Sequence, residues 1–260
     1  MATDISVMGR SFSVLENTND NFWARVNNGS WEPETFEIFD RFVDEDTLVI
    51  DFGAWIGPTV LFAAQSAGMT LAFEPDQAAF KTLRNNVDLN AEAAWSSRIR
   101  IFEEGIHASG KPITIGAPGK AGNSTSGSLF AGRKASWTIE THRLQDVIAK
   151  HRGDHKKIFV KMDIEGGEYD LIPEITDLFA DPSITFYISF HQRILRGFIE
   201  ARTGDEDAAT EEYNGIMRKT YDCLPWDRTI ERTNGKPFRP AMVKRRMANN
   251  RRLPPELVIY

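Results

Sequence analysis

Cysteine is almost absent from this sequence of 260 residues, and long apolar runs are lacking. The single cysteine, Cys223, excludes a disulfide within the chain and a metal cluster built from several thiolates. No apolar run approaches the length of a membrane span, and the first residues lack the charged and then apolar pattern of a signal peptide. We therefore expect a cytoplasmic protein without a membrane partner.

An excess of basic residues is also lacking, since the net charge is −6. General nucleic-acid binders normally carry more lysine and arginine than acid, so the balance argues against nucleic acid as a partner. Charge is nevertheless uneven along the chain. Acids gather at 205–212 and bases at 244–252, which indicates either a solvated surface or an anion site for a phosphorylated or nucleotide-linked substrate.

Predicted strands and helices alternate through the middle of the chain, which indicates an α/β fold with a parallel sheet and right-handed crossovers. The predicted strands are 48–52, 69–74, 98–103, 158–163 and 184–190. The predicted helices are 58–67, 76–90, 143–151 and 167–180, the last with a break at Pro173. Ligands of such sheets bind beyond the carboxyl ends of the strands, where Asp51, Glu74, Glu104, Asp163 and His191 fall.

The additions to this core are less regular. Residues 1–47 are expected to form an arm or short strand and then a helix from Pro33, ahead of a main domain at 48–260. Residues 113–115 and 136–140 resemble two strands of a hairpin, and the glycine- and serine-rich loop at 116–132 between them could cover a substrate. A helical and basic extension is expected at 193–255, with Asn234-Gly235 as a turn between two of the final strands.

The stretch that most constrains function is 48–59, which reads LVIDFGAWIGPT. Its first residues are apolar, as a buried parallel strand requires, and Asp51 then opens a turn that contains Gly53 and Gly57. Glycine lets the backbone approach a ligand, and the start of the following helix offers free N–H donors. A second strand ends at Glu74, whose carboxylate suits the two hydroxyls of a ribose.

The turn discriminates between two nucleotide cofactors. A dinucleotide-binding turn reads G-x-G-x-x-G, whereas this turn reads Gly53-Ala-Trp-Ile-Gly57 and follows Asp51. An anionic side chain repels a pyrophosphate and attracts a cationic sulfonium. The pattern therefore favours S-adenosylmethionine, and an NAD-dependent enzyme is the alternative.

Two motifs carry a resemblance to a known family. The turn is similar to motif I of class I methyltransferases, and Lys161-Met-Asp-Ile-Glu-Gly-Gly-Glu168 resembles the K-x-D-x-E-G-x-E signature of FkbM-family methyltransferases. The resemblance runs in order from about Trp31 to His191. It implies a Rossmann-like, seven-stranded, mostly parallel sheet with helices on both faces and S-adenosylmethionine as cofactor. It also implies O-methylation of a hydroxyl on a small molecule, sugar or secondary metabolite.

The same resemblance implies a cofactor site. The turn would hold the methionine end of the cofactor, Glu74 the ribose, and the residues after the third strand the adenine, where strand alternation lets only one of Glu103 and Glu104 face the pocket. Trp31 would lie over the cofactor, although packing of this ring on the following helix is an equal alternative. The expected cofactor residues are Trp31, Glu32, Asp51, Gly53, Ala54, Trp55, Gly57, Pro58, Thr59, Glu74, Pro75, Glu104, Gly105 and Ile106.

The candidate catalytic residues are Asp163, Glu165 and His191. In an extended segment the two acids point the same way, where they could orient a hydroxyl, act as base, or hold a divalent cation together with His191. Glu168 better suits charge compensation at the start of the next helix. Related sequences often carry an acid two positions before the histidine, where this chain has Ser189, so a catalytic and a structural histidine are both open.

The expected mechanism is in-line displacement of a methyl group by a hydroxyl oxygen, with His191 or Asp163 taking the proton. Two further alternatives are a nucleic-acid methyltransferase that uses the basic residues 244–252 and a catalytically silent cofactor-binding protein. The sequence does not identify the methyl acceptor, the metal dependence or the oligomeric state.

Overall fold

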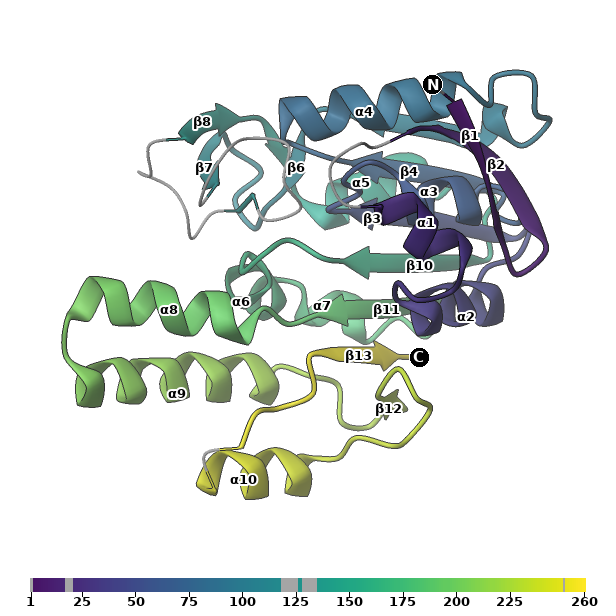
Figure 1. The fold of residues 1–260 in the computed structure, drawn as a ribbon. Helices are drawn as coiled ribbons and strands as arrows, with labels where there is room; N and C mark the ends of the chain where they lie inside the picture. Colours follow the sequence, from purple (N-terminus) through teal and green to yellow (C-terminus); the bar gives the residue numbers. More distant parts are fainter. Residues whose placement is uncertain (1, 17–20, 118–125, 128–134, 250) are drawn as a thin grey trace.

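The computed structural model describes residues 2–16, 21–117, 126–127, 135–249 and 251–260. Its centre is a seven-stranded sheet with the order β12-β13-β11-β10-β3-β4-β5 (Figure 1). β13 runs antiparallel to both of its neighbours, and the other strands of this sheet share one direction. The expected mostly parallel sheet is therefore confirmed. The strands are β3 (Thr47–Phe52), β4 (Met69–Phe73), β5 (Ile99–Phe102), β10 (Lys157–Met162), β11 (Ile184–Ser189), β12 (Ile230–Glu231) and β13 (Glu256–Ile259).

Helices cover both faces of the sheet, as expected, because alternate side chains of the central strands enter two separate cores. In β3, Leu48 and Ile50 enter one core and Val49 enters the other. The core of Val49 is covered by α1 (Phe22–Asn27), α2 (Pro33–Phe42), α3 (Pro58–Ala63) and α4 (Gln77–Asp88). The opposite core is covered by α5 (Leu144–His151), α6 (Glu168–Leu171), α7 (Thr176–Phe179), α8 (Gln192–Thr203), α9 (Glu206–Asp222) and α10 (Pro240–Ala248).

The N-terminal region is more ordered than the sequence predicted. In place of one arm, β1 (Ala2–Val7) and β2 (Arg10–Leu15) form an antiparallel hairpin, and the polar segment after it contains α1. Asn86 of α4 and Asn90, two residues after the end of this helix, bind the backbone of β2: Asn86 accepts from Leu15 N at 2.8 Å, and Asn90 accepts from Ser13 N at 2.9 Å. Side-chain amides thus replace a neighbouring strand along this edge of the hairpin.

The excursion after the third parallel strand is a hairpin, as predicted, formed by β7 (Ile113–Ala117) and β8 (Ala135–Ile139). Most of the predicted glycine-rich loop at 116–132 lies outside the described residues. Short elements flank this excursion: η1 (Ser96–Arg98), β6 (Gly105–Ile106) and β9 (Thr141–His142).

The later helices also follow the predicted pattern. The helix expected at 167–180 is interrupted at Pro173 by the 3-10 turn η3 (Ile172–Glu174), which separates α6 from α7. The extension begins with the helical hairpin of α8 and α9. Among the described residues, no helix combines the length and apolar character needed to cross a bilayer.

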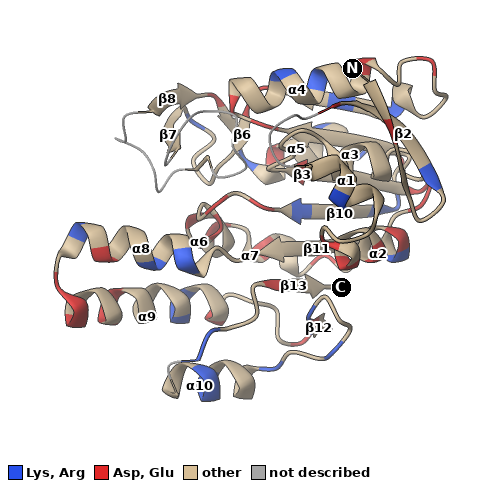
Figure 2. Ribbon diagram, viewed as in Figure 1, with Lys and Arg blue, Asp and Glu red and all other residues tan. Residues whose placement is uncertain are grey.

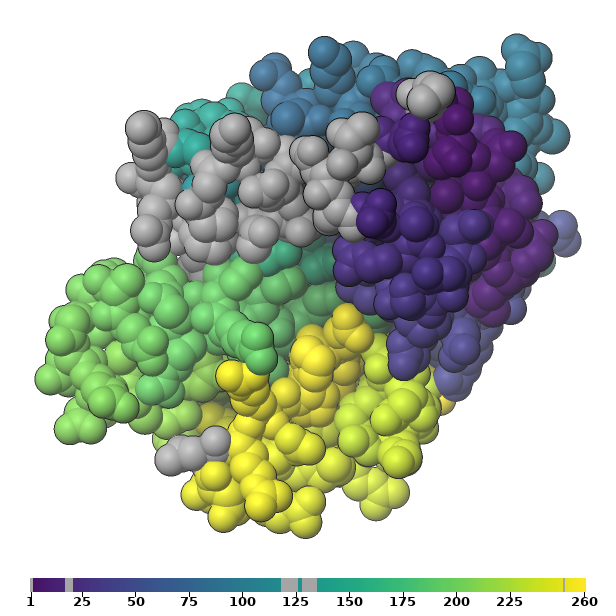
Figure 3. Space-filling model, viewed as in Figure 1, coloured from purple at the N-terminus to yellow at the C-terminus, as the bar shows by residue number. Residues whose placement is uncertain are grey.

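On the face shown in Figure 3, the C-terminal residues lie beside the N-terminal helices. The ring of Tyr260 packs 5.0 Å from that of Phe42 on α2, and Arg41 forms an ion pair with Glu231 of β12. These contacts join the N-terminal helices to the strands at the far edge of the sheet.

Candidate active site

A cavity of about 940 Å³ lies beyond the carboxyl ends of the parallel strands. It is lined by most of the residues that the sequence suggested for the cofactor: Trp31, Glu32, Gly53, Ala54, Trp55, Pro58, Thr59, Glu74, Pro75, Gly105 and Ile106. All three candidate catalytic residues, Asp163, Glu165 and His191, line the same cavity. The topology therefore brings segments that are more than one hundred residues apart into one site.

The turn after β3 needs glycine for two reasons. Gly53 adopts φ +86°, which disfavours other residues, and a Cβ atom there would lie 1.7 Å from the carbonyl oxygen of Asp163. Backbone contact at this point brings the ends of β3 and β10 together. Gly57 adopts φ +93° and precedes α3, so its role is to start the helix rather than to line the cavity.

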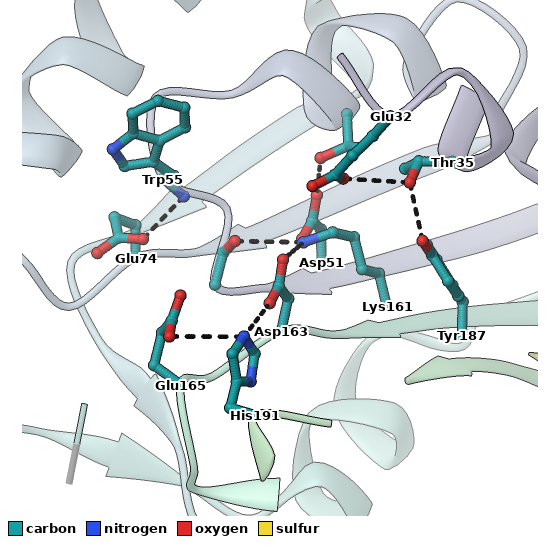
Figure 4. A network of polar contacts seen from close by, with 12 residues as sticks. Glu32, Thr35, Asp51, Trp55, Glu74, Lys161, Asp163, Glu165, Tyr187 and His191 are labelled. Carbon is teal, nitrogen blue, oxygen red and sulfur yellow. Dashed lines mark hydrogen bonds and ion pairs between the residues drawn. The ribbon is translucent and has the colours of Figure 1, made fainter. Parts of the chain in front are cut away.

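Glu74 is nearly buried, and its carboxylate organises the turn (Figure 4). One oxygen accepts from Trp55 N at 2.8 Å and the other from Asp76 N at 2.8 Å. Burial raises the pKa of Glu74 to about 7. Because a carboxylate has about four acceptor positions, each oxygen can accept one more hydrogen bond from a ligand in the cavity.

Asp51, expected at the ligand, is instead fully buried behind the cavity. It accepts from the hydroxyl of Thr59 at 2.5 Å and forms an ion pair with Lys161 at 3.1 Å. Lys161 extends from the neighbouring strand position in β10 and also lies 3.4 Å from Asp163. Burial alone would lower the pKa of Lys161, but Asp51 and Asp163 outweigh it and raise that pKa, so the ammonium stays charged. The sequence motif contained Lys161 but did not show this bridging role.

His191 lies among three carboxylates, and Figure 4 shows two of them, those of Asp163 and Glu165. Its Nε2 atom is 3.3 Å from Asp163 and 3.5 Å from Glu165, and its Nδ1 atom is 3.3 Å from Glu168. Asp163 follows β10 and His191 follows β11, so adjacent strand ends position the pair. The acids thus approach the two sides of one imidazole ring.

Glu168 corrects two expectations from the sequence. It does not serve only the start of α6, since its fully buried carboxylate accepts from His191 N at 2.6 Å and from Gly166 N at 2.8 Å. The absence of an acid at Ser189 does not leave the imidazole unoriented either. Glu168 supplies the orienting carboxylate from 23 residues upstream, a separation at which sequence spacing gives no signal.

The protonation of the cluster argues against His191 as the base. Burial would lower the pKa of His191, but hydrogen bonds to Asp163 and Glu168 outweigh it and raise the pKa to about 11. The imidazole therefore already carries its proton at neutral pH. Burial raises the pKa of Glu165 to about 7, which leaves this carboxylate able to exchange a proton near neutrality.

The same three residues satisfy the donor pattern of a divalent-cation site. Asp163, Glu165 and His191 each offer one ligand atom, and these atoms lie within 4.8 Å of one another. Glu168 on Nδ1 supplies the second contact that metal-bound histidines usually make. A cation would take the place of the proton on Nε2, so the two states are mutually exclusive.

Three residues of the cavity wall adopt a left-handed backbone although they are not glycine. They are Glu32 at φ +40°, Trp55 at φ +49° and Glu165 at φ +52°. Such conformations cost of order 1 kcal/mol or more and are concentrated at functional sites. Glu165 is therefore not in the extended segment assumed from the sequence, and the left-handed turn is what carries its carboxylate toward His191.

Other wall residues complete or correct the site. Trp31 lines the cavity, and its ring packs 5.8 Å from that of Phe36 of α2, so the packing on the following helix is observed and the role over the cofactor stays a prediction. Glu104 does not line the cavity, because its carboxylate pairs with His142 at 2.5 Å. Glu256, which no motif suggested, lines the cavity from the start of β13.

The sheet order, with its single antiparallel strand β13 and a glycine turn after the central strand β3, defines the fold of a class I methyltransferase. The family profile described as "Methyltransferase FkbM domain" matches residues 51–218. The chain therefore belongs to the FkbM methyltransferase family, a family of S-adenosylmethionine-dependent enzymes. A search of curated proteins finds no match.

Solved structures that are similar to this chain include the following three. The FkbM methyltransferase of Methylobacillus flagellatus KT is 16% identical, with 92% of this chain and 54% of that chain covered and a TM-score of 0.46. Trm5b of Pyrococcus abyssi is 11% identical, with 99% and 54% covered and a TM-score of 0.39. An rRNA methylase of Streptococcus thermophilus is 10% identical, with 86% and 91% covered and a TM-score of 0.37. This chain thus spans about half of the first two structures.

Proposed function

We propose that this protein transfers a methyl group from S-adenosylmethionine to a hydroxyl of a small molecule, such as a sugar or secondary metabolite. One observation carries the proposal: a single cavity contains both the Gly53 turn with Glu74 and the cluster of Asp163, Glu165 and His191. Residues suited to a nucleoside and residues suited to a hydroxyl thus face the same space.

The cavity wall fits the cofactor. Glu74 keeps acceptor positions for the ribose hydroxyls, and Glu32, Asp163 and Glu256 make the wall rich in acid. An acidic wall favours a cationic sulfonium over a neutral thioether. When bound, S-adenosylmethionine supplies a methyl group on a positively charged sulfur, and that sulfur keeps the bonding electron pair as a neutral thioether after transfer.

The cluster around His191 would prepare the acceptor. Glu165 takes the proton from the hydroxyl while the oxygen forms its bond to the methyl carbon, because its raised pKa of about 7 matches a base at neutral pH. His191 stays an imidazolium that donates to the acceptor oxygen or to Asp163, and Glu168 fixes the ring. Lys161 holds Asp163 ionised beside the imidazolium, where Asp163 can accept from His191 Nε2.

The test separates cofactor binding from turnover. S-adenosylhomocysteine should raise the melting temperature, because a ligand that binds only the folded state stabilises it, whereas NADH should not. Glu74→Ala should weaken this binding by about 1.5–3 kcal/mol through the loss of a charged hydrogen-bonding partner. Glu103→Ala is the matched control, since Glu103 is exposed and does not line the cavity.

The second arm measures formation of S-adenosylhomocysteine with a panel of hydroxylated acceptors. Glu165→Gln should lose turnover and keep cofactor binding. Stabilisation by NADH alone would overturn the cofactor assignment, and undiminished turnover of Glu165→Gln would remove Glu165 as the base.

A further inference from the structure

A second cavity of about 700 Å³ adjoins the first and differs from it in charge. The two cavities share Phe190, His191, Pro255 and Glu256 as wall residues, so they meet beside the His191 cluster. The second cavity is bounded by the start of α8, the turn after β12, α10 and the segment that leads into β13. Figure 2 shows basic residues on α10 and on that segment.

Four arginines line this cavity: Arg193, Arg232, Arg246 and Arg252. Arg10, Arg41, Arg152, Arg196 and Arg202 form ion pairs with carboxylates and do not line the second cavity, whereas none of the four cavity arginines has an ion pair among the described residues. A chain with a net charge of −6 has more acidic than basic residues. A group of four arginines without an ion pair to a carboxylate therefore requires an explanation.

A second observation concerns the side chain of Arg232. Its Nε atom is buried and has no hydrogen-bond partner. A buried donor without an acceptor is costly, above all on a charged group, and it calls for an explanation such as strain, a bound water or an ion. The N–H of Arg232 donates to the carbonyl of Lys236 at 3.0 Å, and the carbonyl of Arg232 accepts from Gly235 N at 2.8 Å, so the backbone of this turn is fixed beside the cavity.

We propose that the second cavity binds an oxyanionic group, with the charge of a phosphate, on the methyl acceptor. Guanidinium groups present paired N–H donors that match the oxygens of such an anion. The wall also contains the neutral polar residues Gln192, Thr233 and Asn234. Glu256 is the single acid among the described residues of this wall, and it stands at the junction with the first cavity.

This inference rests on the proposed function, which it narrows to a class of acceptor. An acceptor with its anion among the arginines would extend past His191 and present a hydroxyl to Asp163 and Glu165. The shared wall residues define that path. A cavity of this size fits a small phosphorylated or similarly charged molecule rather than the continuous backbone of a nucleic acid.

The experiment titrates inorganic phosphate into the protein by calorimetry, with chloride holding the ionic strength constant. Phosphate should bind, and Arg232→Gln and Arg246→Gln should each weaken it about tenfold or more, because each removes a charge-assisted contact. Arg193→Gln, at an exposed position of α8, tests the same wall without the folding risk of Arg232. The matched control is Arg245→Gln, which lies next to Arg246 on α10 but does not line the cavity.

The outcomes separate this inference from the proposed function. Phosphate binding with no response to S-adenosylhomocysteine would support the anion site and overturn the methyltransferase proposal. Binding of the homocysteine product without phosphate binding would overturn the anion site alone. Equal losses in Arg245→Gln, or tight salt-dependent binding of RNA that depends equally on Lys244 and Arg245, would also overturn it.

Discussion

Gly53 shows how a single residue fixes the distance between two parts of the site. Its backbone lies against the carbonyl of Asp163, so the proposed cofactor turn and the candidate catalytic residue Asp163 are joined without an intervening side chain. The structure also shows which cations offset the repulsion among the carboxylates of Asp163, Glu165 and Glu168. The imidazolium of His191 contacts all three carboxylates. Lys161 lies between Asp163 and the buried Asp51.

Gly53→Ala should therefore be far more damaging than the same change elsewhere. The added Cβ would overlap the Asp163 carbonyl, and we expect a loss of about 3 kcal/mol or more in the free energy of unfolding, measured in urea. Gly9→Ala is the matched control: φ is +79° there and no atom lies within 4 Å of the added Cβ. It should cost only the left-handed backbone penalty of about 1–2 kcal/mol. Equal losses in the two variants would refute a steric role for Gly53.

His191 should keep its ring proton well above neutral pH. In EDTA, ¹⁵N chemical shifts should show an imidazolium through pH 9, because the neighbouring carboxylates raise the pKa to about 11. Glu168→Gln should lower that pKa by removing one of them. His151 is the internal comparison, since partial burial and then Lys150 lower its pKa. Titration of His191 near 6.5 would contradict this protonation state, and deprotonation on adding Mg²⁺ or Mn²⁺ would show a cation in the proton's place.

At the scale of elements, the parallel strands and their helices could be predicted because their patterns are local. An apolar run such as 48–52 predicts a buried strand from its own residues. The acids that follow the strands lie close together because the parallel sheet brings the strand ends to one edge. The β1–β2 hairpin and Glu168 were missed or misjudged because their partners are remote in sequence. The backbone of Ser13 is bound by the side chain of Asn90, and the imidazole of His191 is oriented by Glu168 of α6.

The contact between α4 and β2 should be a strong stabilising point. Asn90→Ala would leave both the N–H and the carbonyl of Ser13 without their partner, for a loss of about 2–3 kcal/mol in the free energy of unfolding. The matched control is Asn85→Ala on α4, for which the structure shows no side-chain hydrogen bond among the described residues and we expect a change within about 0.5 kcal/mol. Similar urea midpoints for wild type and Asn90→Ala would show that water replaces the amide.

At the scale of the whole molecule, stability and the acidity of the site are linked through Glu256. Burial, and then the charges of Glu32 and Asp163, raise its pKa to about 7. Between about pH 4.5 and 7 the folded protein therefore binds more protons at this site than the unfolded chain, so this contribution to stability falls as pH rises.

Glu256→Gln should remove that pH-dependent loss. The variant should exceed wild type by about 1–3 kcal/mol at pH 8.5, and the difference should vanish near pH 4.5. Thermal unfolding across this range measures it, with Glu37→Gln at an exposed position of α2 as the control. A difference that grows toward low pH would mean that the Glu256 carboxylate stabilises the fold as an anion.

The position of β13 between β11 and β12 has a consequence for synthesis on the ribosome. Residues 256–259 are made after their two neighbours, so the nascent chain has an unpaired edge on β11 until this strand leaves the exit tunnel. An open apolar edge is a template for pairing with another chain. Translation that stops before residue 256 should therefore yield aggregated fragments rather than a partly active enzyme.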